Sequence, residues 1–97
     1  MADVFHALSS PVRRQILKML KARDMTAGEI SDRLAVTKPT LSGHFNVLKA
    51  ADLVVTSRDG TTITYSLNTS VVEDVLTLMV SLLGNSDEKD ISDADKI

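Results

Sequence analysis

Apolar residues recur at helical spacing along most of the chain, and capping signals separate the runs. The first run, Val4 to Leu8, ends at the Ser9-Ser10-Pro11 step. Ser10 then predicts the N-cap of a second helix, in which Pro11 is tolerated at the first position. The buried stripe predicted for this second helix is Val12, Ile16, Leu17 and Leu20, with Arg13, Arg14, Lys18 and Lys21 facing solvent.

Two further helices are predicted next, joined by a tight turn. The segment Thr26-Ala27-Gly28-Glu29 fits a capping box, so a third helix begins at residue 27, with Ile30 and Leu34 facing inward. Ala35 and Val36 form the turn. Thr37 is the candidate cap of a fourth helix, which carries Pro39 in its first turn. The inward stripe predicted for the fourth helix is Leu41, Phe45 and Leu48, and the helix runs to Ala51.

After Asp52 the hydrophobic pattern changes from the helical period to that of strands. Residues 53–56 are rich in β-branched side chains, Arg58-Asp59-Gly60 is a hairpin signal, and residues 62–67 alternate. A last helix follows residues 68–70 and runs to Leu83, with Gly84 as a left-handed C-cap. The predicted order is α-α-α-α-β-β-α. This order indicates a mainly α protein with a two-stranded β wing, the winged helix-turn-helix plan.

Charge divides the chain into two parts. The net charge of the 97 residues is −2, but residues 1–84 carry nine Lys and Arg against eight Asp and Glu, whereas residues 85–97 carry two against five. Residues 85–97 are strongly acidic and have few apolar side chains, so they cannot form a helix or strand that packs on a core. We therefore expect one DNA-binding and dimerisation domain over residues 1–84 and an acidic, disordered tail over residues 85–97.

Several classes of function lack support in the sequence. Cysteine is absent, which excludes disulfides, thiolate metal sites and a cysteine nucleophile. The chain has no signal-peptide pattern and no run of about 18 apolar residues, so we expect no membrane insertion and a cytoplasmic location. No phosphate-binding glycine loop or acid–base pair is found at a recognisable spacing. We therefore expect a protein that is not an enzyme and has no catalytic residue, metal or cofactor.

Short polar side chains gather at the start of the fourth predicted helix. A recognition helix needs hydrogen-bonding groups there, because base edges lie closest to that end and the helix dipole favours phosphate. Taken singly, each of these residues can be an ordinary cap or surface residue. Together they predict that this helix reads DNA. The residues that supply this chemistry are Thr37, Lys38, Thr40, Ser42 and His44, and Gly43 and Asn46 lie on the same outward face.

The chain resembles the ArsR family of winged-helix repressors over residues 4–83. The resemblance rests on residues 7–17, which read ALSSPVRRQIL, and on residues 37–48, which read TKPTLSGHFNVL. Within that family, residues 25–30 and 65–69 are similar to the branch of SdpR-like autorepressors. The resemblance implies a dimer, operator contacts by Lys38, Thr40, Ser42 and His44, and a backbone contact by Arg58 in the wing.

Two departures from the family pattern affect the expected DNA contacts. Gly43 stands where relatives often carry a larger polar residue, and it costs a helix about 1 kcal/mol relative to Ala. The wing is also poor in arginine, with Thr61 and Thr62 close after Arg58, so we expect weak wing contacts. The predicted DNA-binding residues are Thr37, Lys38, Thr40, Ser42, Gly43, His44, Asn46 and Arg58.

The last predicted helix carries two apolar stripes. One packed face needs only one stripe, and a wide apolar surface is normally covered. We expect the first stripe, with Val71, Val75, Leu78 and Leu82, to face the core and the second to meet its copy in a partner chain. A doubly packed core helix is the alternative. The predicted interface of the homodimer is Val4, Phe5, Leu8, Val72, Leu76, Met79 and Leu83.

Together these features predict a sequence-specific repressor that binds double-stranded DNA as a homodimer on an inverted repeat, with its own operon as one candidate target. The ligands that metal-sensing relatives carry on the third and last helices are missing. A site made by His6, Asp3 and the partner's Glu73 is an open alternative, as are a ligand-gated sensor and a protein-interaction module that does not bind DNA. The resemblance also suggests an antagonist protein as a partner.

Overall fold

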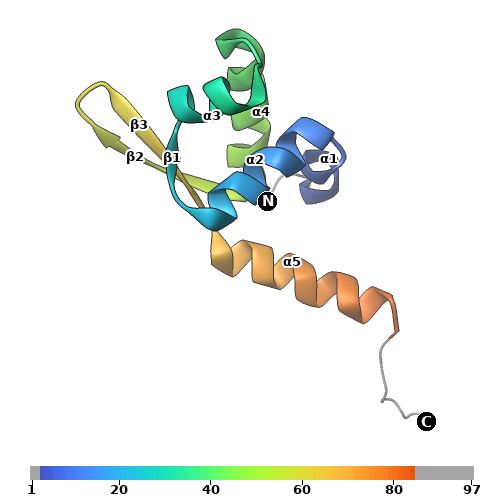
Figure 1. Cartoon of the computed structure of the whole chain (residues 1–97). Coiled ribbons are helices and arrows are strands. Elements are labelled where there is room, and N and C mark those ends of the chain that lie inside the picture. Colours follow the sequence, from blue (N-terminus) through green and yellow to red (C-terminus); the bar gives the residue numbers. More distant parts are fainter. Residues whose placement is uncertain (1–2, 85–97) are drawn as a thin grey trace.

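The computed structural model describes residues 3–84, so the acidic tail predicted over residues 85–97 lies outside the described residues. Five helices and three strands follow one another in the described chain, and Figure 1 shows their arrangement. The predicted winged helix-turn-helix order is confirmed, with one short strand added. The elements are α1 (Val4–Leu8), α2 (Pro11–Ala22), β1 (Met25–Thr26), α3 (Ala27–Leu34), α4 (Lys38–Ala50), β2 (Val54–Asp59), β3 (Thr62–Leu67) and α5 (Thr69–Leu82).

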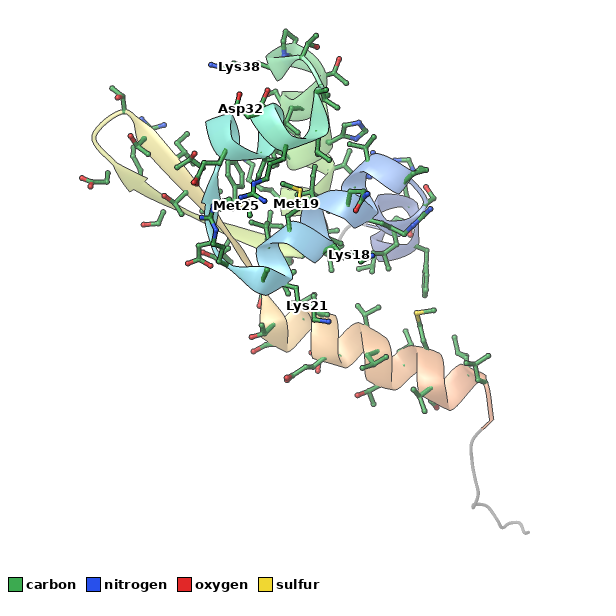
Figure 2. The ribbon with its side chains drawn as sticks, viewed as in Figure 1. Lys18, Met19, Lys21, Met25, Asp32 and Lys38 are labelled. Carbon is green, nitrogen blue, oxygen red and sulfur yellow. The ribbon has the colours of Figure 1, made fainter. Side chains whose placement is uncertain are left out.

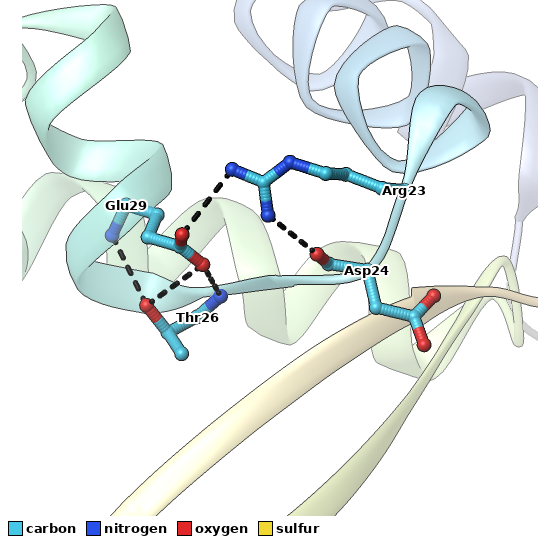
Figure 3. A network of polar contacts seen from close by, with 4 residues as sticks. All are labelled: Arg23, Asp24, Thr26 and Glu29. Carbon is cyan, nitrogen blue, oxygen red and sulfur yellow. Dashed lines mark hydrogen bonds and ion pairs between the residues drawn. The ribbon is translucent and has the colours of Figure 1, made fainter.

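Side-chain caps explain where α2 and α3 begin. Ser10 accepts a hydrogen bond from the backbone N–H of Arg13 at 3.2 Å, and Pro11 follows at the start of α2. The predicted capping box at α3 is present: the Glu29 N–H donates to Thr26 Oγ1 at 3.2 Å, and the Thr26 N–H donates to Glu29 Oε1 at 2.9 Å. Figure 3 shows this network, to which Arg23 adds an ion pair with Glu29 at 3.2 Å.

The predicted two-stranded wing is confirmed as β2 and β3, and a short strand joins it to give a three-stranded antiparallel sheet with the order β1-β3-β2. The β2–β3 hairpin closes with Asp59 opposite Thr62, and Gly60 in the turn has φ +64°. The additional strand β1 pairs Met25 with Tyr65. A strand of only two residues has no alternation that a pattern could reveal. It therefore depends on its partner β3.

The core lies where α2, α3 and α4 meet the base of the sheet. The largest side chains that are fully buried there are Ile16, Ile30, Leu41, Leu48 and Leu53. Phe45 of α4 stacks on Tyr65 of β3 with ring centroids 3.9 Å apart, so the helix and the wing share one aromatic contact. Because α4 packs by its predicted apolar stripe, its opposite face stays on the surface.

The prediction that Arg13 faces solvent is wrong. Arg13 is buried, with 8% of its surface exposed, beneath the end of α1. Its position one turn before Ile16 and two turns before Leu20 places it on the buried stripe of α2. Its guanidinium is satisfied there by carbonyl oxygens, which is what allows a charged group to be buried.

The prediction that the first stripe of α5 faces the core is wrong for its second half, because Leu78 and Leu82 are exposed, whereas the contact of the second stripe with a partner stays a prediction. The helix divides along its length instead. Val71, Val72 and Val75 in its first half pack partly against the core, whereas no residue of α5 is fully buried. In Figure 1, α5 extends below the body, on the side away from the wing and α4. The large apolar side chains that remain exposed in its second half and at its C-cap are Leu76, Leu78, Met79, Val80, Leu82 and Leu83.

Candidate nucleic-acid interface

The turn between α3 and α4 holds the two helices of the helix-turn-helix together. Ala35 ends α3 in the left-handed conformation with φ 53°, and its N–H donates to the Ser31 carbonyl. The Ser31 hydroxyl donates to the Val36 carbonyl at 2.9 Å, which closes the turn with a side chain of α3. The predicted tight turn at Ala35 and Val36 is therefore confirmed, and it sets where α4 begins.

One face of α4 is exposed. Its opposite face is buried through Leu41, Phe45 and Leu48, as predicted. Figure 2 shows Lys38 extending outward from the first turn of α4. At Gly43 a Cβ atom would meet nothing within 4 Å, so this position is an open surface. The predicted DNA-binding residues that are exposed on α4 or at its start are Thr37, Lys38, Thr40, Ser42, Gly43 and Asn46.

Thr37 occupies the N-cap position of α4, but its side chain does not cap the helix. Its hydroxyl instead lies 3.0 Å from the Thr40 hydroxyl, and the two form a hydrogen bond. The first free N–H groups of α4 are therefore those of Lys38 and Thr40, since Pro39 has none, and they lack a side-chain acceptor in the region where the helix dipole is positive. Such an end suits an anion such as a DNA phosphate.

His44 differs from the other predicted contact residues because it is half-buried and bound to Arg13. An Arg13 guanidinium nitrogen lies 3.1 Å from His44 Nδ1. The other guanidinium nitrogens donate to the Ala7 carbonyl at 2.8 Å and to the His6 carbonyl at 2.9 Å. Burial, together with the nearby Arg13 charge, lowers the pKa of His44 below its usual value. The imidazole is therefore neutral near pH 7.

The sequence pattern missed this role of Arg13, although a signal was available. Arg13 falls on the same helical line as Ile16 and Leu20, so a strict reading of the 3.6-residue period would have placed it inside. The positive charge of Arg13 favoured the opposite prediction, that the side chain faces solvent. Only the carbonyl oxygens at the end of α1 explain how the buried position is tolerated, and these come from a different helix.

The wing residue Arg58 lies near the end of β2, where it is exposed and opposite Ile63 of β3. Figure 1 shows the hairpin of β2 and β3 projecting from the body. Arg58 therefore comes from a different element than the other predicted DNA contacts. Its contact with the DNA backbone stays a prediction.

The predicted interface residues are not equally available to a partner. Val4 is buried in the core of its own chain, with 7% exposed. Leu8 and Val72 are half-buried and line an apolar hollow of about 240 Å³ between α2 and α5, with Lys18 and Lys21 also in its wall. The predicted residues that remain open on the surface are Phe5, Leu76, Met79 and Leu83.

The alternative of a metal site on α1 includes Glu73 of a partner chain, so a single chain does not test it. Within residues 3–84, no three His, Cys, Asp or Glu side chains gather closely enough to hold a metal ion. The Asp3 carboxylate accepts a hydrogen bond from the His6 N–H at 3.1 Å, so it serves as the N-cap of α1. Over the same residues, no helix combines the length and hydropathy needed to cross a membrane.

Comparison with known proteins finds several transcriptional regulators. Residues 8–57 match a family described as a helix-turn-helix domain. The transcriptional repressor SdpR of Bacillus subtilis (strain 168) is 44% identical over 87 residues, which cover 90% of this chain and 97% of SdpR.

Two solved structures have a similar fold. HlyU from Vibrio cholerae N16961 superposes with a TM-score of 0.69 at 32% identity, covering 81% of this chain and 86% of HlyU. An ArsR-like transcriptional regulator from Rhodococcus sp. RHA1 superposes with a TM-score of 0.73 at 29% identity, covering 81% of this chain and 74% of that one. These similarities cover both the helix-turn-helix and the wing.

Proposed function

The chain belongs to the ArsR family of winged helix-turn-helix regulators, and we propose that it is a transcriptional repressor that binds a specific DNA sequence as a homodimer. The observation that carries the proposal is the outward face of α4. It joins an uncapped helix start, an exposed lysine at residue 38 and short polar side chains on an otherwise well-packed helix. A DNA-binding repressor acts beside the chromosome, which places it in the cytoplasm.

Each group on this face has a counterpart in the major groove. The free N–H groups at the start of α4 and the Lys38 ammonium suit phosphates, which position the helix on the duplex. The hydroxyls of Thr40 and Ser42 and the Asn46 amide can donate to or accept from base edges. Arg58 in the wing adds a second phosphate contact at a distance from α4.

The proposal of a homodimer is supported by the exposed apolar surface of Phe5 and the second half of α5. Two copies related by a twofold axis would present two α4 helices to the same face of the DNA, about 34 Å apart, which is one turn of B-form DNA. The operator is then an inverted repeat. Binding at such a site within a promoter represses by occluding the polymerase.

Titration of the purified protein against the DNA upstream of its own coding sequence tests the proposal. We expect binding that resists unrelated competitor DNA and that weakens steeply as salt rises, because phosphate contacts release counterions. Equal affinity for all DNA sequences would contradict the proposal. Replacing Ser42 with Ala should weaken specific binding, whereas Ser81→Ala, a matched change at an exposed position on α5, should leave it unchanged.

A further inference from the structure

Arg13 joins three parts of the molecule at one buried point. Its guanidinium donates to the carbonyl oxygens of His6 and Ala7 at the end of α1 and lies 3.1 Å from Nδ1 of His44 on α4. No carboxylate pairs with Arg13 among the described ion pairs, and only 8% of its surface is exposed. The residue is therefore held by neutral acceptors alone.

The chemistry of the guanidinium determines the protonation and the tautomer of the His44 ring. A guanidinium has five N–H donors and no acceptor, so Nδ1 of His44 must be the acceptor in this contact. An imidazole that accepts at Nδ1 is neutral and carries its proton on Nε2. The burial that lowers the pKa of His44 acts in the same direction. His44 thus has one N–H donor left, on the side of the ring away from Arg13.

We propose that Arg13 is a positioning residue for DNA reading, which fixes His44 as an Nε2–H donor directed at a hydrogen-bond acceptor of the DNA. This inference rests on the proposed repressor function and adds to it a residue that does not itself touch DNA. The acceptor is a purine N7, a carbonyl oxygen on a base edge, or a phosphate oxygen. All of these take the same donor.

Arg14 provides a matched control on the same helix. It is also an arginine of α2 that donates to a carbonyl of α1, that of Leu8 at 2.7 Å, but it is exposed and makes no contact with His44. Replacing either arginine with Met removes one positive charge and the contact with α1. Only Arg13→Met also removes the N–H donor that fixes the tautomer of the His44 imidazole.

The first measurement needs no DNA. The ¹⁵N chemical shifts of the His44 ring, recorded at a pH of about 8 where an ordinary imidazole is neutral, report the tautomer. We expect the Nε2–H form in the wild type and in Arg14→Met, and a mixture of the two tautomers in Arg13→Met. An unchanged His44 spectrum in Arg13→Met would overturn the proposal, whatever the protein does with DNA.

The second measurement uses a duplex selected from a random-sequence pool by the wild-type protein. Arg13→Met should lower the affinity for this duplex about tenfold, the scale of one lost hydrogen bond with an unsatisfied partner, and Arg14→Met by much less. If Arg13 acts through His44, Arg13→Met should have no further effect in a His44→Ala protein. Additive losses would overturn the proposal. A pool that yields no enriched sequence would instead refute the repressor function.

A conservative variant separates positioning from mere stability. In His44→Gln, the amide oxygen can accept from Arg13 while the amide nitrogen donates outward, so affinity should be largely retained, in contrast to His44→Ala. Selection repeated with Arg13→Met identifies the acceptor. Loss of preference at one base of the site indicates a base edge, and a uniform loss over all sites indicates a phosphate. Loss of binding in His44→Gln equal to that in His44→Ala would contradict the proposed donor.

Discussion

At the scale of single residues, two non-glycine residues in the described chain have left-handed backbone angles, Ala35 with φ 53° and Asp52 with φ 60°. Each ends a helix that flanks or forms the reading motif. At the end of α4, the Asp52 N–H donates a hydrogen bond to the Lys49 carbonyl and the Leu53 N–H donates one to the Leu48 carbonyl. This pair of hydrogen bonds is the Schellman motif. At both positions the chain adopts the left-handed conformation that ends the helix, although the residue is not glycine.

Replacing Ala35 with Gly should therefore stabilise the fold. A left-handed alanine costs about 1 kcal/mol that glycine avoids, so the free energy of unfolding should rise by about that amount. Chemical denaturation measures the change. The same substitution at Ala22, a right-handed position in α2, should lower stability. Equal losses at both positions would show that the turn at Ala35 is not left-handed in solution.

The lowered pKa of His44 predicts a pH dependence of stability. As the pH falls below about 6.5, the unfolded chain takes up a proton at His44 that the folded chain does not, so the free energy of unfolding decreases. Denaturant unfolding at pH values of about 7.5 and 5.5 should show this decrease in the wild type. The decrease should be smaller in His44→Gln, which has no imidazole there. If the free energy of unfolding depended on pH identically in the two proteins, the assignment of this decrease to His44 would be contradicted.

At the scale of elements, α3 and α4 begin with the same residue type used in different ways. Thr26 caps α3 through the hydrogen bond to the Glu29 N–H and also belongs to β1, so it joins a strand directly to a helix. Thr37 stands at the start of α4 without capping it. The start of α3 is capped by a side chain, which stabilises it, whereas the start of α4 is uncapped and lies at the surface predicted to bind DNA.

Threonine-to-alanine substitutions at the two helix starts should separate stability from DNA binding. Thr26→Ala should lower the free energy of unfolding by about 1 kcal/mol, because it removes a capping hydrogen bond. Thr37→Ala should change stability little, since it removes only a contact between two exposed hydroxyls, but it should weaken operator binding. Thermal unfolding and DNA titration of both variants measure the two effects. Equal destabilisation would mean that Thr37 also caps its helix.

At the scale of the whole molecule, the second half of α5 and its C-cap carry the most exposed large hydrophobic side chains of the described chain. Leu83 is 83% exposed and Leu82 is 71% exposed. A helix of this length is only marginally stable in water by itself, so its stability must come from packing against something else. The proposed second copy of the chain would satisfy this requirement and would also present two α4 helices to the DNA.

A charge placed on this surface should separate the protomers. Leu76 is 61% exposed, and Leu76→Glu should shift the protein from dimer to monomer and weaken operator binding, because each monomer has only one reading helix. Sedimentation measures the change. Thr77→Glu places the same charge on the line of α5 that also carries Glu73 and Ser81, and it should leave the dimer intact. A wild type that sediments as a monomer would refute the proposed assembly.

The sequence by itself determined the features that depend on neighbours along the chain. The capping box at Thr26, the turn at Ala35, the hairpin at Gly60 and the inward stripe of α4 each need only residues within one or two turns of one another. The outward face of α4 follows from its inward stripe. The candidate DNA-binding residues on this helix, apart from the environment of His44, could therefore be named in advance.

Only the tertiary structure decided the features that depend on distant partners. Strand β1 exists because β3 lies beside it, and Arg13 is buried because α1 supplies carbonyl oxygens. The first half of α5 packs partly against the core through its valines, and its second half finds no such cover within the described chain. The pattern of apolar residues along a helix shows which faces can be buried. What covers each face depends on where the other elements end, and that is a property of the folded molecule.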